Sequence, residues 1–225
     1  STEWWYLNGH LTTASGRALS FFVSFFRVVK GRNAATGDFE HAHSITWALS
    51  DPAGERYWHE SRVDKDAPRM GFQKVERGEG ARDDRLRRAV REVLVKGKVP
   101  YPDQMFRGDV FVDARRLDLD FDGQRLCKDD EGRYHLHLRQ LHAQVGIDLC
   151  LTPRKPPIRH GIDGVVKGVS GEDMFYYFIP RCALAGTVLL PGGPEDVMSG
   201  HGWYDHEFGG HASEASSRCP CARSR

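Results

Sequence analysis

Short runs of strand-forming residues, separated by turn signals, recur along most of the chain. The run from Tyr134 to Leu141 alternates apolar and polar residues, which is typical of a strand with one face buried and one in water. Turn residues such as those at 51–54 and 191–194 lie between runs. This pattern predicts an all-β fold, an antiparallel barrel or sandwich. The predicted strands cover residues 3–11, 18–29, 41–49, 57–59, 110–112, 116–123, 134–141, 145–151, 175–181 and 186–190.

Three segments depart from this rhythm. Residues 83–96 carry apolar side chains at helical spacing, so they are predicted to form one short helix that packs against the sheet or covers a barrel end. Residues 154–161 contain several prolines and basic residues and are predicted to be an extended linker. Residues 211–225 have no hydrophobic period and are predicted to be a disordered or out-of-frame tail.

Composition excludes several classes of protein. The 225 residues are 40% hydrophobic and 28% charged, which suits a folded core, and the net charge of +1 argues against a nucleic-acid partner. The five cysteines are scattered and odd in number, so they predict neither a disulfide framework nor a zinc ribbon. No apolar run reaches the roughly 20 residues of a membrane span. The sequence leaves the compartment open between cytoplasm and periplasm, and peripheral membrane association stays possible.

The richest motif lies between Gly200 and Gly210. In an extended chain, alternation puts one set of side chains on one face and a second set on the other. The first face would then carry an acid/base set beside an indole ring, although a plain polar strand end is the alternative interpretation. The first set is His201, Trp203, Asp205 and Glu207, and the second is Tyr204, His206 and Phe208.

Histidines raise the question of a metal site. His41 and His43 share a strand face, but no third ligand is fixed by spacing, so hydrogen bonding is favoured over metal binding. A weaker hypothesis builds a metal site from the motif residues His201, Asp205, His206 and Glu207. The favoured prediction includes no metal and no cofactor.

Several of these stretches together resemble one family. They are Glu3-Trp4-Trp5-Tyr6 with Gly9-His10-Leu11, the Phe-rich run ending at Arg27, His41-Ala42-His43, Leu151-Thr152-Pro153-Arg154-Lys155-Pro156-Pro157 with His160-Gly161, Tyr176-Tyr177, and Gly-x-x-Trp-x-Asp-x-Glu-x-Gly from Gly200 to Gly209. In this order they resemble the lipocalin-like family of carotenoid 1,2-hydratases and AttH-like proteins.

The resemblance implies two lipocalin-like β-barrels that meet at a pocket for a hydrophobic ligand. It implies a first domain over residues 1–198, an inter-domain motif at 199–210 that begins a second barrel, and a chain that looks truncated before that barrel is complete. It also implies that Asp205 protonates a carbon–carbon double bond, with Trp203 beside it. The hydratases tend to carry Tyr-His-Asp-His where this chain has Trp203-Tyr204-Asp205-His206, which puts hydration itself in question.

The leading hypothesis is therefore a cofactor-free hydratase, isomerase or cyclase that acts on a hydrophobic unsaturated substrate. Asp205 is the predicted proton donor with Glu207 in reserve, and His201 or His206 would orient water. Aromatic rings would bind the substrate and stabilise a cation. The alternative is a non-catalytic carrier of a lipid or other apolar ligand, with the carboxylates in structural roles. The predicted substrate-binding residues are Trp203, Tyr204, Trp5, Tyr176 and Tyr177.

Overall fold

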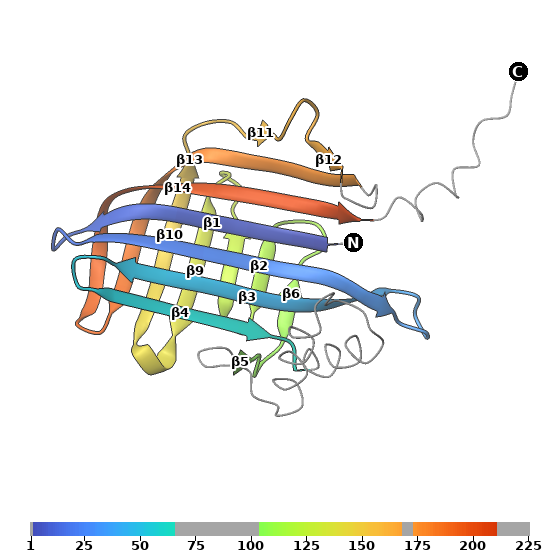
Figure 1. The fold of residues 1–225 in the computed structure, drawn as a ribbon, viewed down its shortest axis with the longest axis horizontal. Coiled ribbons are helices and arrows are strands. Elements are labelled where there is room, and N and C mark those ends of the chain that lie inside the picture. The colour runs from blue at the N-terminus through green and yellow to red at the C-terminus, as the bar shows by residue number, and fades with distance from the viewer. Residues whose placement is uncertain (1, 66–103, 168–172, 211–225) are drawn as a thin grey trace, which may run out of the picture.

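The computed structural model describes residues 2–65, 104–167 and 173–210, and these form one curled, almost entirely antiparallel sheet (Figure 1). The strand order is β5-β4-β3-β2-β1-β14-β13-β10-β9-β8-β7-β6, with β11 and β12 paired to β13. The bounds are β1 Thr2–Thr13, β2 Ala18–Arg32, β3 Phe39–Asp51, β4 Arg56–Val63, β5 Gln104–Met105, β6 Val110–Val112, β7 Asp118–Phe121, β8 Gln124–Lys128, β9 Tyr134–Gln140, β10 Val145–Pro153, β11 Ile158–Arg159, β12 Val165–Lys167, β13 Asp173–Leu190 and β14 Gly193–Gly210, with a 3-10 turn (η1) at Leu141–Ala143.

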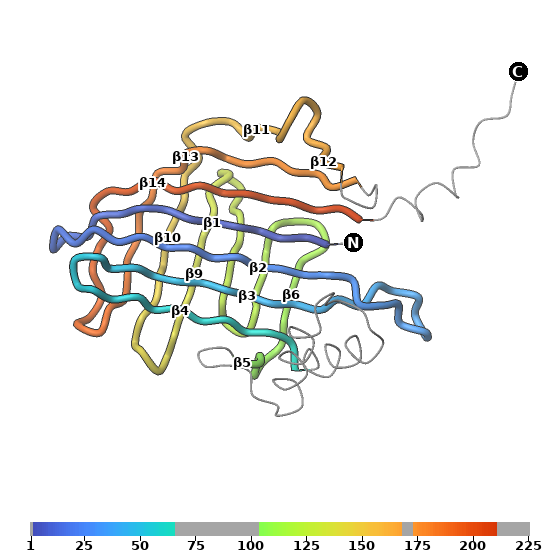
Figure 2. The backbone as a smooth tube through the Cα atoms, viewed as in Figure 1, coloured from blue at the N-terminus to red at the C-terminus, as the bar shows by residue number. Residues whose placement is uncertain are grey.

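The sheet folds over on itself to make two layers. Strands β4, β3, β2 and β1 form the front layer with the second half of β14 and the first half of β13, while β10 to β6 run across behind them (Figure 1). The long hairpin β13–β14 curves from the front layer into the rear layer, as the backbone path in Figure 2 shows. The all-β antiparallel prediction is confirmed, and the architecture is a lipocalin-like half-barrel.

The core fills the space between the layers. Val23 and Trp47 of the front layer and Ile147 of the rear layer have no exposed surface. The rings of Phe25 and Phe121 meet edge to face across the layers, with centroids 5.2 Å apart. Alternation supplies this core, because every second residue of each strand points inward.

At the open edge of the half-barrel, hydrogen bonds from side chains connect the two layers in place of backbone pairing between strands. Within the described residues β5 and β6 are the two ends of the strand order and do not pair with each other. Arg62 on β4 instead donates from Nη1 to the backbone oxygen and to Oδ2 of Asp122 in the β7–β8 turn, both at 3.2 Å. Gln140 Nε2 donates to the backbone oxygen of His59 at 2.9 Å. These contacts hold the front edge against the rear layer.

The structure corrects several predicted boundaries. The runs at 175–181 and 186–190 are not two strands but one continuous strand, β13, and the linker at 154–161 contains the short strand β11. The prediction failed because Pro180 and Gly186 look like strand breakers. Pro180 instead lies at a register shift, and Gly186 adopts φ +131° where β13 passes so close to β10 that a Cβ would meet a backbone oxygen at 2.1 Å.

Strand β8 was missed, since its residues follow the turn after β7 without a clear alternation. The helix predicted over 83–96 and the tail at 211–225 lie outside the described residues. The domain boundary predicted after residue 198 falls inside β14, which pairs with β1 and β13 of the same sheet, and the second barrel stays a prediction. Across the described ranges no helix is long and apolar enough to cross a membrane.

Candidate functional site

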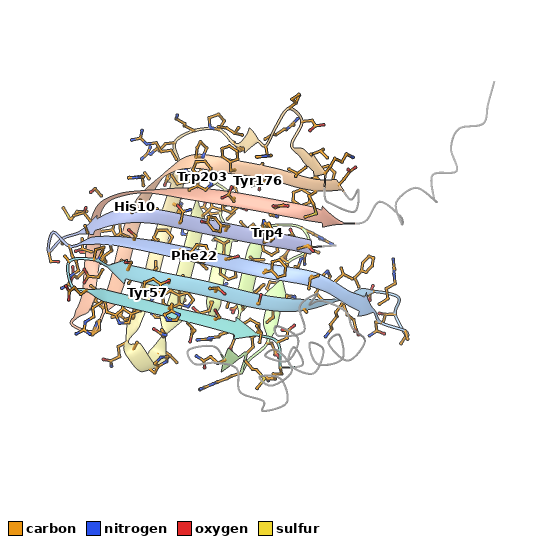
Figure 3. The ribbon with its side chains drawn as sticks, in the orientation of Figure 1. Trp4, His10, Phe22, Tyr57, Tyr176 and Trp203 are labelled. Carbon is orange, nitrogen blue, oxygen red and sulfur yellow. The ribbon has the colours of Figure 1, made fainter. Side chains whose placement is uncertain are left out.

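The Gly200–Gly210 motif forms the second half of β14, in the front layer. It is hydrogen-bonded to β1 on one side and to β13 on the other. The predicted alternation is confirmed. Trp203 and Asp205 lie on the outer face, defined here as the face of the front layer turned away from the core, while Tyr204 and His206 point inward. Figure 3 shows Trp203 and Tyr176 on this outer face together with Trp4 and Phe22.

Asp205 is the centre of the outer-face cluster. The residue is only 8% exposed, although it faces outward, because aromatic side chains surround it. Tyr176 donates from its hydroxyl to Oδ1 at 2.8 Å, and Trp203 donates from Nε1 to Oδ2 at 2.7 Å. Burial raises the pKa of the Asp205 carboxyl above its ordinary value, and the two hydrogen bonds act in the opposite direction. The carboxyl is thus held in a fixed orientation and biased toward the acid form.

Aromatic rings form the walls around this carboxyl. The Trp203 indole stacks on Phe178 with centroids 4.8 Å apart and planes 11° apart. Tyr6 is the cross-strand partner of Asp205 on β1. The ring of Tyr176 stacks on His160 at 4.9 Å. Burial and the Asp205 charge raise the pKa of Tyr176 to about 12, so this hydroxyl remains a donor throughout the neutral range.

Glu207 is the second carboxylate on the outer face. It follows Asp205 by two residues, which places the two side chains roughly 7 Å apart along the strand. Its cross-strand partners are Trp4 on β1 and Tyr176 on β13, and the Trp4 indole hydrogen-bonds to it. Burial raises the pKa of Glu207, and the Asp205 charge acts in the same direction. Two carboxyls with raised pKa values therefore share this surface.

A different polar cluster lies on the inner face of the same strand. His206 Nε2 is 2.9 Å from Glu3 Oε1, and His206 Nδ1 is 3.2 Å from the Tyr177 hydroxyl. Arg27 donates from Nε to Glu3 Oε2 at 2.7 Å, and the Tyr204 hydroxyl bonds to Tyr177. One tautomer satisfies the whole chain, with His206 donating to Glu3 and accepting from Tyr177.

This inner cluster borders a cavity of about 350 Å³ at one end of the half-barrel. The imidazole of His206 stacks on Trp5 with centroids 5.4 Å apart. Burial acts to raise the pKa of Glu3, but the hydrogen bond from His206 and the charge of Arg27 hold it below its ordinary value. Glu3 is therefore ionised at neutral pH and is ion-paired with Arg27.

A comparison with known protein families finds a match over the part of the chain that contains the motif. The model of a family described as AttH-like matches residues 102–218, which include both strands that hold Asp205 and Tyr176. This chain belongs to the AttH-like family. No curated protein matches the chain.

Two solved structures share the fold of this AttH-like chain. A putative AttH from Nitrosomonas europaea has a TM-score of 0.63 at 20% identity, over 95% of this chain and 53% of that one. Kievitone hydratase from Nectria haematococca has a TM-score of 0.61 at 11% identity, over 93% of this chain and 48% of that one. The chain thus spans about half the length of either structure.

The predicted site residues of this AttH-like chain fall on two opposite faces of one sheet. Asp205 therefore contacts only part of the predicted set, because the rings of Trp5 and Tyr177 lie on the inner face of the sheet. His201 shares the outer face but lies near His10, with ring centroids 5.7 Å apart, and makes no hydrogen bond to Asp205 in the structure described here. The outer set is His201, Trp203, Asp205, Glu207 and Tyr176, and the inner set is Trp5, Tyr177, Tyr204 and His206.

Sequence reasoning missed members of both clusters. Glu3 and Arg27 were quoted as parts of family-like motifs, but not as partners of His206. Phe178 was not singled out, although it alternates with Tyr176 along β13. The signal that unites these residues is cross-strand register, Glu3 opposite Arg27 on β2 and Phe178 opposite Asp205 on β14. In the described ranges no group of three or more possible metal ligands is close enough to hold an ion.

Proposed function

We propose that the outer-face cluster is the proton-donating part of a cofactor-free site for an apolar, unsaturated substrate, with Asp205 as general acid. The observation that carries the proposal is a nearly buried carboxyl with a raised pKa, fixed by two donors on an aromatic surface. Addition of water to a double bond is the reaction favoured here, with isomerisation or cyclisation through the same protonation as variants.

The chemistry needs an acid that gives up its proton to carbon. Burial raises the pKa of Asp205 and so favours the protonated carboxyl that a general acid needs. When the proton moves to the substrate, the carboxylate that remains already faces the Tyr176 hydroxyl and the Trp203 N–H. Both donors strengthen their bonds as negative charge develops, so they stabilise the product of the proton transfer without reorganisation.

The aromatic walls suit the other product of that step, a carbocation. Faces of electron-rich rings attract a positive charge within about 6 Å. Trp203, Phe178 and Tyr176 supply such faces beside the acid, and they exclude the water that would quench the cation at random positions.

The proton balance closes without a cofactor. Asp205 transfers its proton to one alkene carbon, water bonds to the other carbon, and the surplus proton of that water returns to a carboxylate. Glu207 is better placed for this last step than His206, because Glu207 shares the face of Asp205 and His206 is behind the sheet. If Glu207 takes the proton, solvent returns it to Asp205 before the next cycle.

The comparisons support this proposal at the level of the fold. A hydratase, kievitone hydratase, has the same fold, and both similar structures are about twice as long as this chain. We place the closing wall of the pocket in a second barrel domain of a protein of that length, lying over the outer face.

Labelled water tests the proposal directly. Purified protein is incubated with acyclic isoprenoids (farnesol, farnesoic acid and lycopene) in D₂O or in ¹⁸O-water, and the products are analysed by mass spectrometry. Deuterium on carbon is expected in every variant of the reaction, and ¹⁸O only in hydration. Asp205→Asn should reduce incorporation at least a hundredfold, since a general acid contributes about 10²–10⁴-fold.

Asp196→Asn is the matched control, because Asp196 is an exposed aspartate on the same strand. It should incorporate label like the unaltered protein. Full incorporation by Asp205→Asn would overturn the proposal.

A carrier function is the second candidate, and the inner cavity favours it. This cavity of about 350 Å³ lies in the position where lipocalin-like barrels hold apolar ligands. Its lining combines aromatic side chains, such as Trp5 and Tyr134, with charged ones, such as Arg27, Arg116 and Lys128. Binding of the isoprenoids with no label in any product, and with equal affinity in Asp205→Asn, is the result that favours the carrier.

A further inference from the structure

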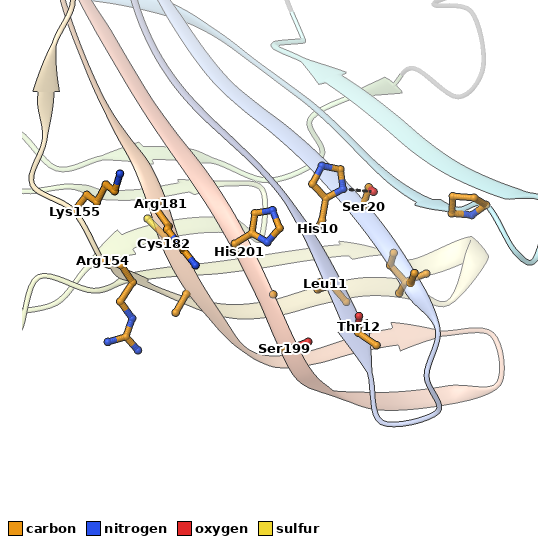
Figure 4. Close-up of a pocket in the computed structure, with 15 residues that line it drawn as sticks. His10, Leu11, Thr12, Ser20, Arg154, Lys155, Arg181, Cys182, Ser199 and His201 are labelled. Atoms are coloured by element: carbon orange, nitrogen blue, oxygen red, sulfur yellow. Dashed lines mark hydrogen bonds between the residues drawn. The ribbon is translucent and has the colours of Figure 1, made fainter.

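A second hollow lies on the outer face at the bend of the β13–β14 hairpin. It has a volume of about 800 Å³ and opens to solvent (Figure 4). Its walls come from β1, β2, β13, β14 and the segment that follows β10. Leu11, Leu19 and Cys182 also border it, and they are buried members of the core.

Three cations border this hollow. Arg154 and Lys155 follow β10, and Arg181 lies in the bulge of β13. The backbone N–H of Arg154 donates to the backbone oxygen of Arg181 at 2.8 Å, so the two residues are neighbours at the backbone. No Asp or Glu lines the hollow, and among the described residues none of these three cations has an ion pair. Elsewhere in the described chain, arginines such as Arg62 and Arg139 are paired with carboxylates.

The opposite wall adds further hydrogen-bonding groups. His10 and His201 are cross-strand partners with ring centroids 5.7 Å apart. His10 Nδ1 is 2.8 Å from the Ser20 hydroxyl, and Ser199 also lines the wall. Cations on one side and imidazole and hydroxyl groups on the other are the chemistry that binds an oxyanion.

The hollow and the proposed acid lie along one strand face. His201, Trp203 and Asp205 alternate on the outer face of β14, so His201 and Asp205 are roughly 13 Å apart along the strand. Trp203 lies between them and stacks on Phe178, which makes an aromatic surface from the hollow to the acid. A ligand with an anionic end and an apolar body would contact both regions at once.

The geometry points to an anion-binding subsite in this hollow, which holds the carboxylate or phosphate end of an elongated apolar ligand while the ligand's unsaturated part reaches Asp205. This inference rests on the proposed function for the unsaturated end only. It narrows the substrate class to amphipathic anions with a double bond in the apolar body, away from the acidic group.

Calorimetric binding tests the subsite without any turnover. The probes are farnesoic acid, its neutral methyl ester and farnesyl monophosphate, each below its aggregation limit. The unaltered protein should bind at least one of the two anions about tenfold more tightly than the ester, since a charge-assisted arginine bond is worth about that factor. The tighter of the two anions identifies whether the natural end group is a carboxylate or a phosphate.

The double variant Arg154→Gln/Arg181→Gln should lose this preference and keep its affinity for the ester. Arg107→Gln/Arg125→Gln removes the same charge away from the hollow and is the matched control, which should keep the preference. Equal affinity for both anions and the ester, or a preference that survives in the Arg154/Arg181 variant, would overturn the inference.

Failure of the two proposals can be told apart. Asp205→Asn should keep the preference for the anion, because Asp205 does not line the hollow. If the unaltered protein shows no preference for the anions, while its label incorporation still depends on Asp205, the subsite alone is rejected. An intact preference with Asp205-independent incorporation would reject the acid alone.

Discussion

Replacing Tyr176 with phenylalanine should make the stability of the protein more dependent on pH. The change removes one hydroxyl and keeps the ring that stacks on His160. It deletes the 2.8 Å hydrogen bond to Asp205 Oδ1 and leaves the bond from Trp203. The effect on the free energy of unfolding depends on whether Asp205 carries a charge.

The magnitude follows from that charge. A hydrogen bond to a charged group is worth about 1.5–3 kcal/mol, and one to a neutral group about 0.5–1.5 kcal/mol. Tyr176→Phe should therefore lower the free energy of unfolding by the larger amount above the folded pKa of Asp205, where the carboxyl is ionised. Below that pKa, where the carboxyl is protonated, it should lower it by the smaller amount.

The sign comes from linkage. The pKa of folded Asp205 is raised, so the folded state binds more protons than the unfolded state between the ordinary pKa and the folded pKa. The free energy of unfolding therefore falls as pH rises from the ordinary pKa to the folded pKa, and it is constant above the folded pKa. Tyr176→Phe raises the folded pKa further, because the anion loses a donor, so the window widens and the fall deepens.

Urea denaturation from mild acid to mild alkali measures this difference. Tyr57→Phe is the matched control, since Tyr57 is 65% exposed and its loss of a hydroxyl should have no pH-dependent effect. In an Asp205→Asn background, Tyr176→Phe should cost the same at every pH. A loss for Tyr176→Phe alone that does not change with pH would refute the assignment of a raised pKa to Asp205.

Two other substitutions test the fold and the inner cluster. Glu3→Gln removes the ion pair to Arg27 and weakens the hydrogen bond from His206, and it should lower the free energy of unfolding by about 1–2 kcal/mol at neutral pH, measured by urea denaturation. Because the pKa of Glu3 is lowered, this contribution is lost as pH falls through the folded pKa, so the two proteins should converge in acid, and a constant difference would contradict the ion-pair assignment. Gly186→Ala should lower the free energy of unfolding by more than about 2 kcal/mol, because its φ of +131° and the 2.1 Å approach of a backbone oxygen leave no room for a Cβ. Gly192 has open space around it, so Gly192→Ala should change the free energy of unfolding by less than about 0.5 kcal/mol. Equal thermal melting points for the two alanine variants would contradict the close packing of β13 on β10.

The sequence was sufficient to predict the local alternation around the motif. Glycines and alternating side chains at 200–210 predict a strand with Trp203 and Asp205 on one face and Tyr204 and His206 on the other, and the structure has this arrangement. The same alternation predicts most strands of the half-barrel. Local pattern is enough here because side-chain direction in a strand depends only on position.

The partners across strands were not predictable from the sequence. Tyr176 and Tyr177 are adjacent in sequence, yet one donates to Asp205 and the other faces His206 on the opposite side. Which of them meets the acid depends on the register of β13 against β14, and a slip of one residue would exchange them. Arg154 and Arg181 likewise meet only because β10 and β13 pair.

The protonation state of Asp205 tests the central claim most directly. Protein labelled with ¹³C at aspartate carboxyl carbons is titrated by NMR, and the Asp205 signal is assigned by its absence in Asp205→Asn. We predict a midpoint above that of the exposed Asp196, and a further rise in Tyr176→Phe. A midpoint at or below that of Asp196 would show that Asp205 is an ordinary carboxylate, which would contradict its role as a general acid.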